Sequence, residues 1–290
     1  MYPNHFDLPQ LLRDADVLKL ELFPLPPHFA AIRDEHVRMS YASVLAATLL
    51  ANQRVSETEG RLFGMLLASL GLAGRQDAVW QQAASLNQVS LRDFLRMAKL
   101  HQLASCFLLD ALVLCRLDGP LSQGQLQLLT EMAELLLPED ELLVLTFWAA
   151  KVLGLPFDAP LPDSCCIAVG NAMRSEKIQV DSFDVFSWGV SDRKANVFSV
   201  KTLLARVGDM LAEQQLILAS LDVTQGEKRL VREARSPVAG CLHKVLLNTG
   251  DVMAASSTCA MLVPLPPSCT VWRAALAIPA PMAVAAEVAA

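Results

Sequence analysis

A chain of 290 residues is long enough for two ordinary domains, and a composition of 53% hydrophobic and 19% charged residues excludes a mostly disordered protein. The formal net charge of −6 argues against general nucleic-acid binding, because a phosphate backbone requires a basic surface. Residues 1–176 carry 13 basic against 20 acidic residues, whereas residues 177–273 carry 11 against nine. A change of charge sign along the chain indicates two domains.

The first half of the chain is predicted to be helical. Residues 1–31 form an N-terminal extension that includes a Pro-rich stretch. From residue 32 to residue 153, apolar side chains recur every three or four positions, which predicts an all-α helical bundle. Ser56, Ser90 and Ser122 are typical helix N-caps, because each precedes an apolar helical run.

A repeat lies within the helical half, where residues 50–59 align with residues 116–125 at a constant offset of 66. In each copy an apolar helix ends, a short polar turn follows, and a serine caps the next helix. Two facing copies of one helix–turn–helix unit predict a compact bundle.

Residues 154–176 are rich in Pro at their start and are predicted to be a linker. In residues 177–273 the apolar runs become short and strand-like. Residues 200–211 align with residues 242–253 at an offset of 42, and each copy contains a Gly-Asp turn. This second repeat predicts two similar β units related by a quasi-two-fold axis. Residues 274–290 are predicted to be a flexible tail.

The helical repeat carries half of an acidic signature in each copy. The first copy has Glu59 but Asn52, and the second has Asp118 but Gln125. Over residues 32–153 this pattern resembles the TerB-like family of tellurite-resistance proteins, whose two turns have the form Ala-Asp-Gly followed by Ser-x-x-Glu. The resemblance implies a weakened divalent-cation site at Glu59 and Asp118. The alternative is that Glu59 only completes a capping box and Asp118 only forms a turn.

Ser-Pro-Val-Ala-Gly at residues 236–240 lies between two Gly-Asp turns. This arrangement resembles the biotinyl/lipoyl-like domain, including the version found in membrane-fusion adaptors. The resemblance implies a barrel-sandwich hybrid over residues 177–273, with a prosthetic lysine at the tip of a central hairpin. Lys228 is the lysine nearest that place, so one prediction is a covalent cofactor on Lys228. The other prediction is an unmodified, solvated lysine and a protein without a cofactor.

Four basic residues cluster within eight positions of the strand half: Lys228, Arg229, Arg232 and Arg235. One interpretation is a solvated edge-strand face, where charge discourages sheet-to-sheet aggregation. The other interpretation is a docking strip for an acidic partner, such as the acidic helical half of a neighbouring molecule.

Other motifs limit the location and the chemistry. The seven cysteines include no C-x-x-C pair, which predicts a reduced, cytoplasmic protein. The N-terminus lacks a signal-peptide pattern, and no apolar run reaches the ~20 residues of a membrane span. The five histidines show no metal-ligand spacing, and phosphate-loop and nucleophile-elbow motifs are missing. No enzyme is therefore predicted.

These expectations combine into an α+β chain of two segregated domains, an N-terminal all-α helical bundle and a C-terminal all-β barrel-sandwich hybrid. The expected function is a non-enzymatic interaction or scaffold module in bacterial stress, phage defence or an envelope-associated assembly. Its expected partners are proteins, including further copies of itself. The alternatives are a carrier of a covalent cofactor on Lys228 and a soluble, membrane-peripheral component of a secretion-type complex.

Overall fold

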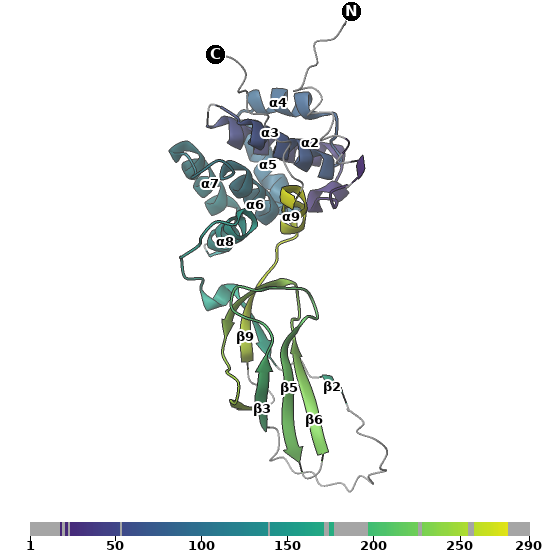
Figure 1. The fold of residues 1–290 in the computed structure, drawn as a ribbon. Coiled ribbons are helices and arrows are strands. Elements are labelled where there is room, and N and C mark those ends of the chain that lie inside the picture. The colour runs from purple at the N-terminus through teal and green to yellow at the C-terminus, as the bar shows by residue number, and fades with distance from the viewer. Residues whose placement is uncertain are drawn as a thin grey trace, which may run out of the picture. The chain divides into compact units, whose positions relative to one another are not determined.

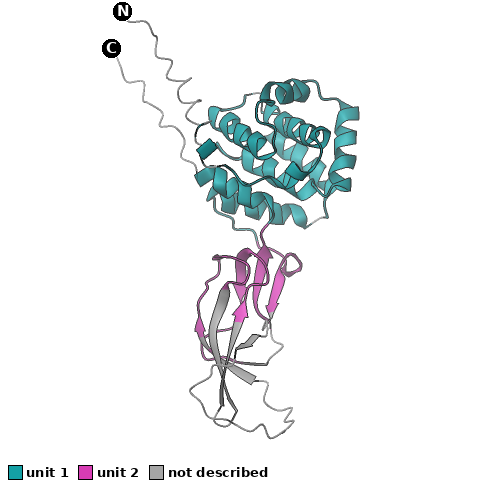
Figure 2. Ribbon diagram, turned by 90° about the vertical axis from the view of Figure 1, so that its right-hand side faces the viewer, with its two compact units in different colours: residues 1–159, 266–290 teal, residues 160–265 magenta. Residues whose placement is uncertain are grey.

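The structure is a computed structural model, and it describes residues 18, 21–22, 24–52, 54–138, 140–170, 174–176, 197–225, 228–254 and 258–277. The chain is α+β, with helices in its N-terminal part and antiparallel strands after them (Figure 1). It divides into two compact units, coloured separately in Figure 2: unit 1 is Met1–Ala159 with Pro266–Ala290, and unit 2 is Pro160–Leu265. Unit 2 is therefore an insertion into the chain of unit 1.

Unit 1 is built from helices. In its described part these are η1 (Phe29–Ile32), α2 (Glu35–Leu50), α3 (Glu57–Ser69), α4 (Gln76–Ala84), α5 (Gln88–Leu100), α6 (Ala104–Cys115), α7 (Gln123–Leu136), α8 (Glu141–Leu153) and α9 (Ser268–Ala277). The central helix is α6, which contacts α2, α3, α7, α8 and α9. All residues of α6 except Ser105 are buried, as expected for a helix that is apolar on every side.

The repeat of 66 residues corresponds to α2–α3 and α6–α7. Ser56 Oγ accepts a hydrogen bond from the N–H of Glu59 at 3.0 Å, and Glu59 Oε2 accepts one from the N–H of Ser56 at 2.8 Å. Ser122 and Gln125 form the same reciprocal capping box at the start of α7. The predicted N-caps at Ser56 and Ser122 are confirmed, because each capping box satisfies two N–H groups at a helix start.

The predicted N-cap at Ser90 is wrong. Asn87 caps α5, and its Oδ1 accepts hydrogen bonds from the N–H groups of Val89 and Ser90 at 2.9 and 3.0 Å. Asparagine is at least as good an N-cap as serine, so the helix begins three residues earlier and Ser90 lies in its first turn.

Unit 2 is built from antiparallel strands: β1 (Ile167–Gly170), β2 (Arg174–Glu176), β3 (Val197–Leu203), β4 (Met210–Leu211), β5 (Leu216–Gln225), β6 (Lys228–Arg235), β7 (Gly240–Val245), β8 (Val252–Ala254) and β9 (Thr258–Pro264). They form one sheet of order β1-β9-β7-β4 and another of order β2-β6-β5-β3-β8. A short 3₁₀ helix, η2 (Asp163–Cys165), precedes β1. The core includes Val169, Val200, Leu211, Leu242 and Leu262.

The repeat of 42 residues appears in unit 2 as a reciprocal exchange of hydrogen bonds. The N–H of Gly208 donates to Leu242 O at 2.7 Å, and the equivalent N–H of Gly250 donates to Val200 O at 2.7 Å. Both glycines have φ of 94°, a left-handed conformation that glycine adopts without strain. The two halves of unit 2 thus hold each other through equivalent residues.

The structure explains why the Ser-Pro-Val-Ala-Gly segment begins with Ser236 and ends with Gly240. Ser236 is fully buried and its hydroxyl donates to Val238 O at 2.6 Å. A Cβ atom at Gly240 would lie 2.3 Å from Val263 O in the neighbouring strand. Only glycine allows the two backbones to approach this closely.

The unit boundaries differ from those expected from the sequence. Residues 154–176 include β1 and β2 rather than a linker alone, because these short strands pair with the distant strands β9 and β6. Unit 2 ends at Leu265 rather than at residue 273, and Ser268–Ala277 form α9 in unit 1. Cys269, Trp272 and Ala275 recur every third residue and are all buried, a helical period that the preceding strand pattern hides. Residues 278–290 lie outside the described part of the chain.

Candidate functional site

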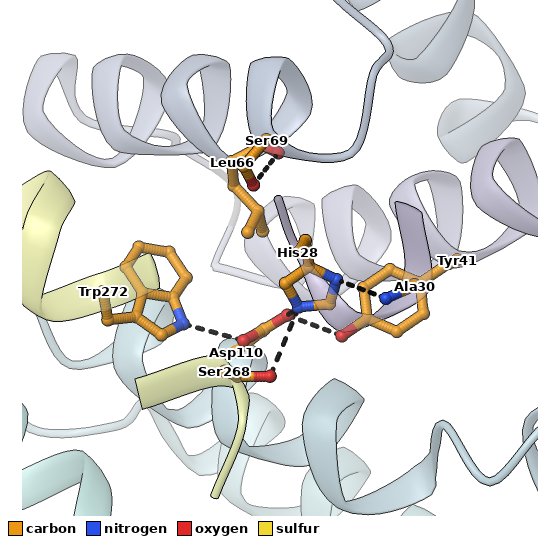
Figure 3. A network of polar contacts seen from close by, with 8 residues as sticks. All are labelled: His28, Ala30, Tyr41, Leu66, Ser69, Asp110, Ser268 and Trp272. Atoms are coloured by element: carbon orange, nitrogen blue, oxygen red, sulfur yellow. Dashed lines mark hydrogen bonds and ion pairs between the residues drawn. The ribbon is translucent and has the colours of Figure 1, made fainter. Parts of the chain in front are cut away.

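The helical unit contains a group of five buried polar side chains, which we call the Asp110 cluster. Figure 3 shows how they converge on Asp110 of α6: His28 precedes η1, Tyr41 comes from α2, and Ser268 and Trp272 come from α9. None of the five is more than 1% exposed. Four segments that are far apart in the sequence therefore meet at one buried place.

Three donors surround the Asp110 carboxylate. The Tyr41 hydroxyl donates to Oδ2 at 2.5 Å and the Trp272 indole N–H donates to Oδ1 at 2.7 Å. His28 Nε2 lies 3.0 Å from Oδ2. A buried carboxylate loses its hydration, and hydrogen bonds from several donors compensate for that loss.

The backbone assigns the tautomer of His28. Its Nδ1 accepts a hydrogen bond from the N–H of Ala30 at 3.0 Å, so this nitrogen carries no proton. The proton of the neutral ring is therefore on Nε2, which faces Asp110 and also lies 3.2 Å from Ser268 Oγ.

A serine, a histidine and an aspartate thus lie together, but they do not form a catalytic relay. In such a relay one ring nitrogen contacts the carboxylate and the other accepts the proton of the hydroxyl. Here the same protonated nitrogen of His28 faces both Asp110 and Ser268, and a backbone N–H occupies the other. His28 therefore cannot remove a proton from Ser268 in this arrangement.

The electrostatics agree with a structural role. Burial and the neighbouring Asp110 carboxylate raise the pKa of Tyr41 well above its usual value, so the phenol stays protonated and donates. Burial raises the pKa of the nearby Cys106 thiol to about 11, and burial with Asp110 raises that of Cys269 as well. Both thiols stay protonated at neutral pH and are poor nucleophiles.

The Asp110 cluster links α9, near the end of the described chain, to segments of unit 1 that precede unit 2. Ser268 and Trp272 follow unit 2 in the sequence, whereas His28, Tyr41 and Asp110 precede it. The polar contacts hold α9 on α6 after the chain has passed through the whole insertion.

The predicted cation site at Glu59 and Asp118 stays a prediction, and the two residues differ in exposure and in hydrogen bonding. Glu59 is 5% exposed and its carboxylate accepts from Ser56 in the capping box, whereas Asp118 is exposed in the turn after α6. Within the described part of the chain, no three His, Cys, Asp or Glu side chains gather as metal ligands. Gln125, the counterpart of Glu59, is buried, and its Nε2 has no hydrogen-bond partner among the residues that the structure describes.

The predicted hairpin exists, and Lys228 follows its connection. Gln225 of β5 pairs with Lys228 of β6, so only residues 226–227 connect the two strands, and these lie outside the described residues. A lysine beside a two-residue connection lies at the end of the hairpin, and a covalent group on Lys228 stays a prediction.

The four residues of the predicted basic strip, Lys228, Arg229, Arg232 and Arg235, all belong to β6. The edge-strand interpretation is wrong for part of this strand, because β2 pairs with β6 at Val231, Arg232 and Glu233. Arg235 is half-buried and its guanidinium donates to Gln214 O at 3.1 Å. The docking interpretation stays a prediction.

Sequence reasoning missed the Asp110 cluster, although one signal was present. Asp110 is the only charged residue between Leu103 and Cys115, within the most apolar helical run of the chain. A carboxylate in such a helix must find buried partners, because an isolated buried charge is very costly. The partners could not be found from the sequence, since Trp272 is 162 residues away.

Of the helices that the structure describes, none alone has the length and apolar composition needed to cross a membrane. The consecutive helices α5 and α6 reach that length and composition only together, and they are bent by 119° at their junction.

Comparisons with family models, with curated proteins and with solved structures find no match to this chain.

Proposed function

We propose that this protein is a non-enzymatic interaction module, in which unit 1 holds unit 2 as an inserted docking domain. The proposed fold of unit 2 is a barrel-sandwich hybrid. The reciprocal contacts of the Gly208 and Gly250 turns and the buried Ser236 support that fold.

The observation that carries the proposal is that the polar groups of the Asp110 cluster are buried and bind one another. His28, Tyr41, Asp110 and Ser268 are sealed from solvent and are held by one another. Their arrangement secures α9, which is the place where the chain returns from the insertion. An insertion is connected to its host at two points, so it is presented more firmly than a domain on a single linker.

The proposed partner is an acidic protein that contacts the basic strip of β6. A basic strip accelerates and orients the encounter with an acidic surface, and salt weakens that attraction. The resemblance of the helical half to TerB-like proteins favours a bacterial stress, phage-defence or envelope-associated setting in the cytoplasm. The resemblance of unit 2 to membrane-fusion adaptors supports a membrane-peripheral secretion-type complex as the other setting.

The proposal is tested by chemical cross-linking of the full chain purified from its own host, followed by mass spectrometry. We expect cross-links from Lys228 and Lys244 of unit 2 to a protein with an acidic surface. The Arg229→Glu/Arg232→Glu variant should lose most of them. The control Arg54→Glu, which changes an exposed residue of unit 1, should retain them. Equal cross-linking of both variants would overturn the docking role of β6.

A second candidate function is a carrier with a covalent group on Lys228. The position of Lys228 directly after the hairpin connection favours it, because a swinging group must stand clear of the sheet. Intact mass spectrometry of the native protein tests this candidate. A mass increment that disappears in Lys228→Ala would establish the carrier and displace the interaction module, whereas an unmodified mass would exclude it.

A further inference from the structure

We propose that the protein also self-associates head to tail, with the exposed face of α5 docking on the exposed face of α7 in a second copy of the chain. These faces belong to unit 1, and the inference therefore does not depend on the docking role of β6.

The exposed face of α5 combines large apolar and basic side chains. Val89 is 65% exposed and Leu100 is 78% exposed. Arg92, Arg96 and Lys99 are also exposed. Positions 89, 92, 96 and 99 are three or four residues apart and position 100 is four residues after 96, so they follow one stripe of the helix. Phe94 and Ala98 are the buried residues of α5, and they lie on the opposite side.

The cations of this face have almost no partners in their own molecule. In the described part of the chain, Arg92 and Lys99 have neither an ion pair nor a side-chain hydrogen bond. Arg96 is 3.9 Å from Asp93, and both side chains are more than half exposed, so this pair contributes little. Like charges four residues apart destabilise a helix. Arg92 and Arg96 therefore repel each other within α5.

The exposed face of α7 has the opposite charge. Glu131, Glu134 and Leu135 are exposed and share one side of the helix, and Leu135 is 56% exposed. Glu134 lies in the last turn, where the helix dipole disfavours a carboxylate. Glu131 accepts from Gln127 at 2.9 Å, whereas Glu134 has no partner among the described residues.

The two faces complement each other. Each presents an exposed leucine beside charges of one sign, and the signs are opposite. Docking would neutralise Arg92 and Lys99 with Glu131 and Glu134 and would remove Leu100 and Leu135 from water. α5 and α7 contact each other within one molecule, but no described ion pair joins their exposed charges. Contact between two different surfaces produces rings or open chains rather than a closed dimer.

Sedimentation velocity of the full chain tests the proposal at low salt (about 50 mM) and high salt (about 500 mM), because screening acts over this range. We expect oligomers at low salt that dissociate at high salt. The Arg92→Glu/Arg96→Glu variant and the Glu131→Lys/Glu134→Lys variant should each weaken association at least about tenfold. A charge-matched control, Arg54→Glu/Arg116→Glu, should associate like the parent chain.

The decisive measurement is a mixture of the two reversed variants. Each variant alone carries the same charge sign on both faces and repels its own copies, but the mixture restores both complementary pairs. Restored association at low salt would support the inference, with circular dichroism confirming that both variants are folded. A mixture that stays monomeric would overturn it, as would a parent chain that is monomeric at both salt concentrations. Binding of that monomer to phosphatidylserine vesicles, lost in Arg92→Glu/Arg96→Glu, would assign the α5 face to an anionic membrane and would also overturn it.

Discussion

In unit 1, side chains that are distant in the sequence hold the two chain segments together. In unit 2, backbone hydrogen bonds between two equivalent halves do so. In unit 1, Asp110 accepts hydrogen bonds from residues on both sides of the insertion. In unit 2, the N–H of Gly208 donates to Leu242 O, and 42 residues later the equivalent N–H of Gly250 donates to Val200 O. The hydrogen bonds of unit 1 depend on the single carboxylate of Asp110, whereas the Gly-Asp turn of unit 2 is present twice. The comparison teaches that a discontinuous unit needs a specific non-local anchor, whereas a unit with internal symmetry uses repeated turns.

The largest expected effect follows from Asp110→Ala. The substitution leaves the buried donors of His28, Tyr41 and Trp272 without their acceptor. Each buried donor left unpaired costs about 1–3 kcal/mol, so the three together cost at least about 3 kcal/mol. We expect unit 1 to lose this amount in the free energy of unfolding, measured by urea denaturation with tryptophan fluorescence. Asp110→Asn keeps the side-chain volume and one acceptor, so it should lose less.

The cysteines report which unit is affected. Cys106, Cys115 and Cys269 are buried in unit 1, and Cys241 and Cys259 are buried in unit 2. In Asp110→Ala, a thiol reagent should modify the three buried thiols of unit 1 before the buried thiols of unit 2, Cys241 and Cys259. Modification of Cys241 and Cys259 at the same rate would show that the two units do not unfold separately, and would contradict the comparison.

A smaller loss is expected from Gly240→Ala, and it should fall on unit 2. The added Cβ would lie 2.3 Å from Val263 O, so β7 and β9 must move apart. Overpacking of this kind costs about 1–3 kcal/mol. Urea denaturation should show the loss, with Cys241 and Cys259 becoming reactive while Cys106 stays protected.

Gly60→Ala is the matched control for this substitution. Gly60 lies in α3, and a Cβ there would meet no atom within 4 Å. Alanine is the better helix former, so this variant should be more stable by up to about 1 kcal/mol. Equal destabilisation by both glycine substitutions would contradict the close-approach argument for Gly240.

What the sequence predicts well in this protein is local. The N-caps at Ser56 and Ser122 follow from a serine directly before an apolar helical run, and the capping box at Ser56 follows from Glu59 three residues later. The Gly-Asp turns follow from adjacent residues. Each is determined by hydrogen bonds between residues a few positions apart, so neighbouring residues in the sequence are enough to predict it. The order of helices before strands was predictable for the same reason, because it follows from the period of apolar residues.

What the sequence did not predict is non-local. Nothing near Trp272 or Ser268 shows that these residues meet Asp110 and His28, up to 240 residues away. The β domain was expected to extend to residue 273, whereas the chain returns to unit 1 at Pro266. The site was missed because its carboxylate, imidazole and indole are isolated in the sequence and gather only in the folded core.

A third prediction tests the internal symmetry of unit 2. Asp209 Oδ2 accepts from the N–H of Arg206 at 2.7 Å, and Asp251 Oδ2 accepts from the N–H of Asn248 at 2.7 Å. Asp209→Ala and Asp251→Ala should each cost about 1 kcal/mol, because each removes one such bond in an exposed turn. Thermal unfolding should give equal losses for the two variants. A loss confined to one variant would show that the two turns are not energetically equivalent.

The smallest effect is expected at the exposed carboxylate of Asp163, in contrast to the buried one of Asp110. Asp163 forms a hydrogen bond and an ion pair with Lys244, and these contacts hold the pKa of Asp163 below its usual value. A lowered pKa in the folded state means that the pair stabilises unit 2 above the unfolded-state pKa. That stabilisation disappears as the pH falls through the folded-state pKa. Because both side chains are exposed to solvent and salt, the contribution to stability should be small.

Lys244→Met tests this expectation directly. The carboxyl-carbon chemical shift of Asp163, followed by NMR against pH, should titrate in the variant near the ordinary value of about 3.9. It should titrate at a lower pH in the parent chain, and added salt should bring the two curves together. Identical curves would show that Lys244 does not act on Asp163 in solution. An exposed ion pair should stabilise the protein far less than a buried network of donors. A loss of stability in Lys244→Met as large as that in Asp110→Ala would therefore contradict the expected difference between the exposed carboxylate of Asp163 and the buried one of Asp110.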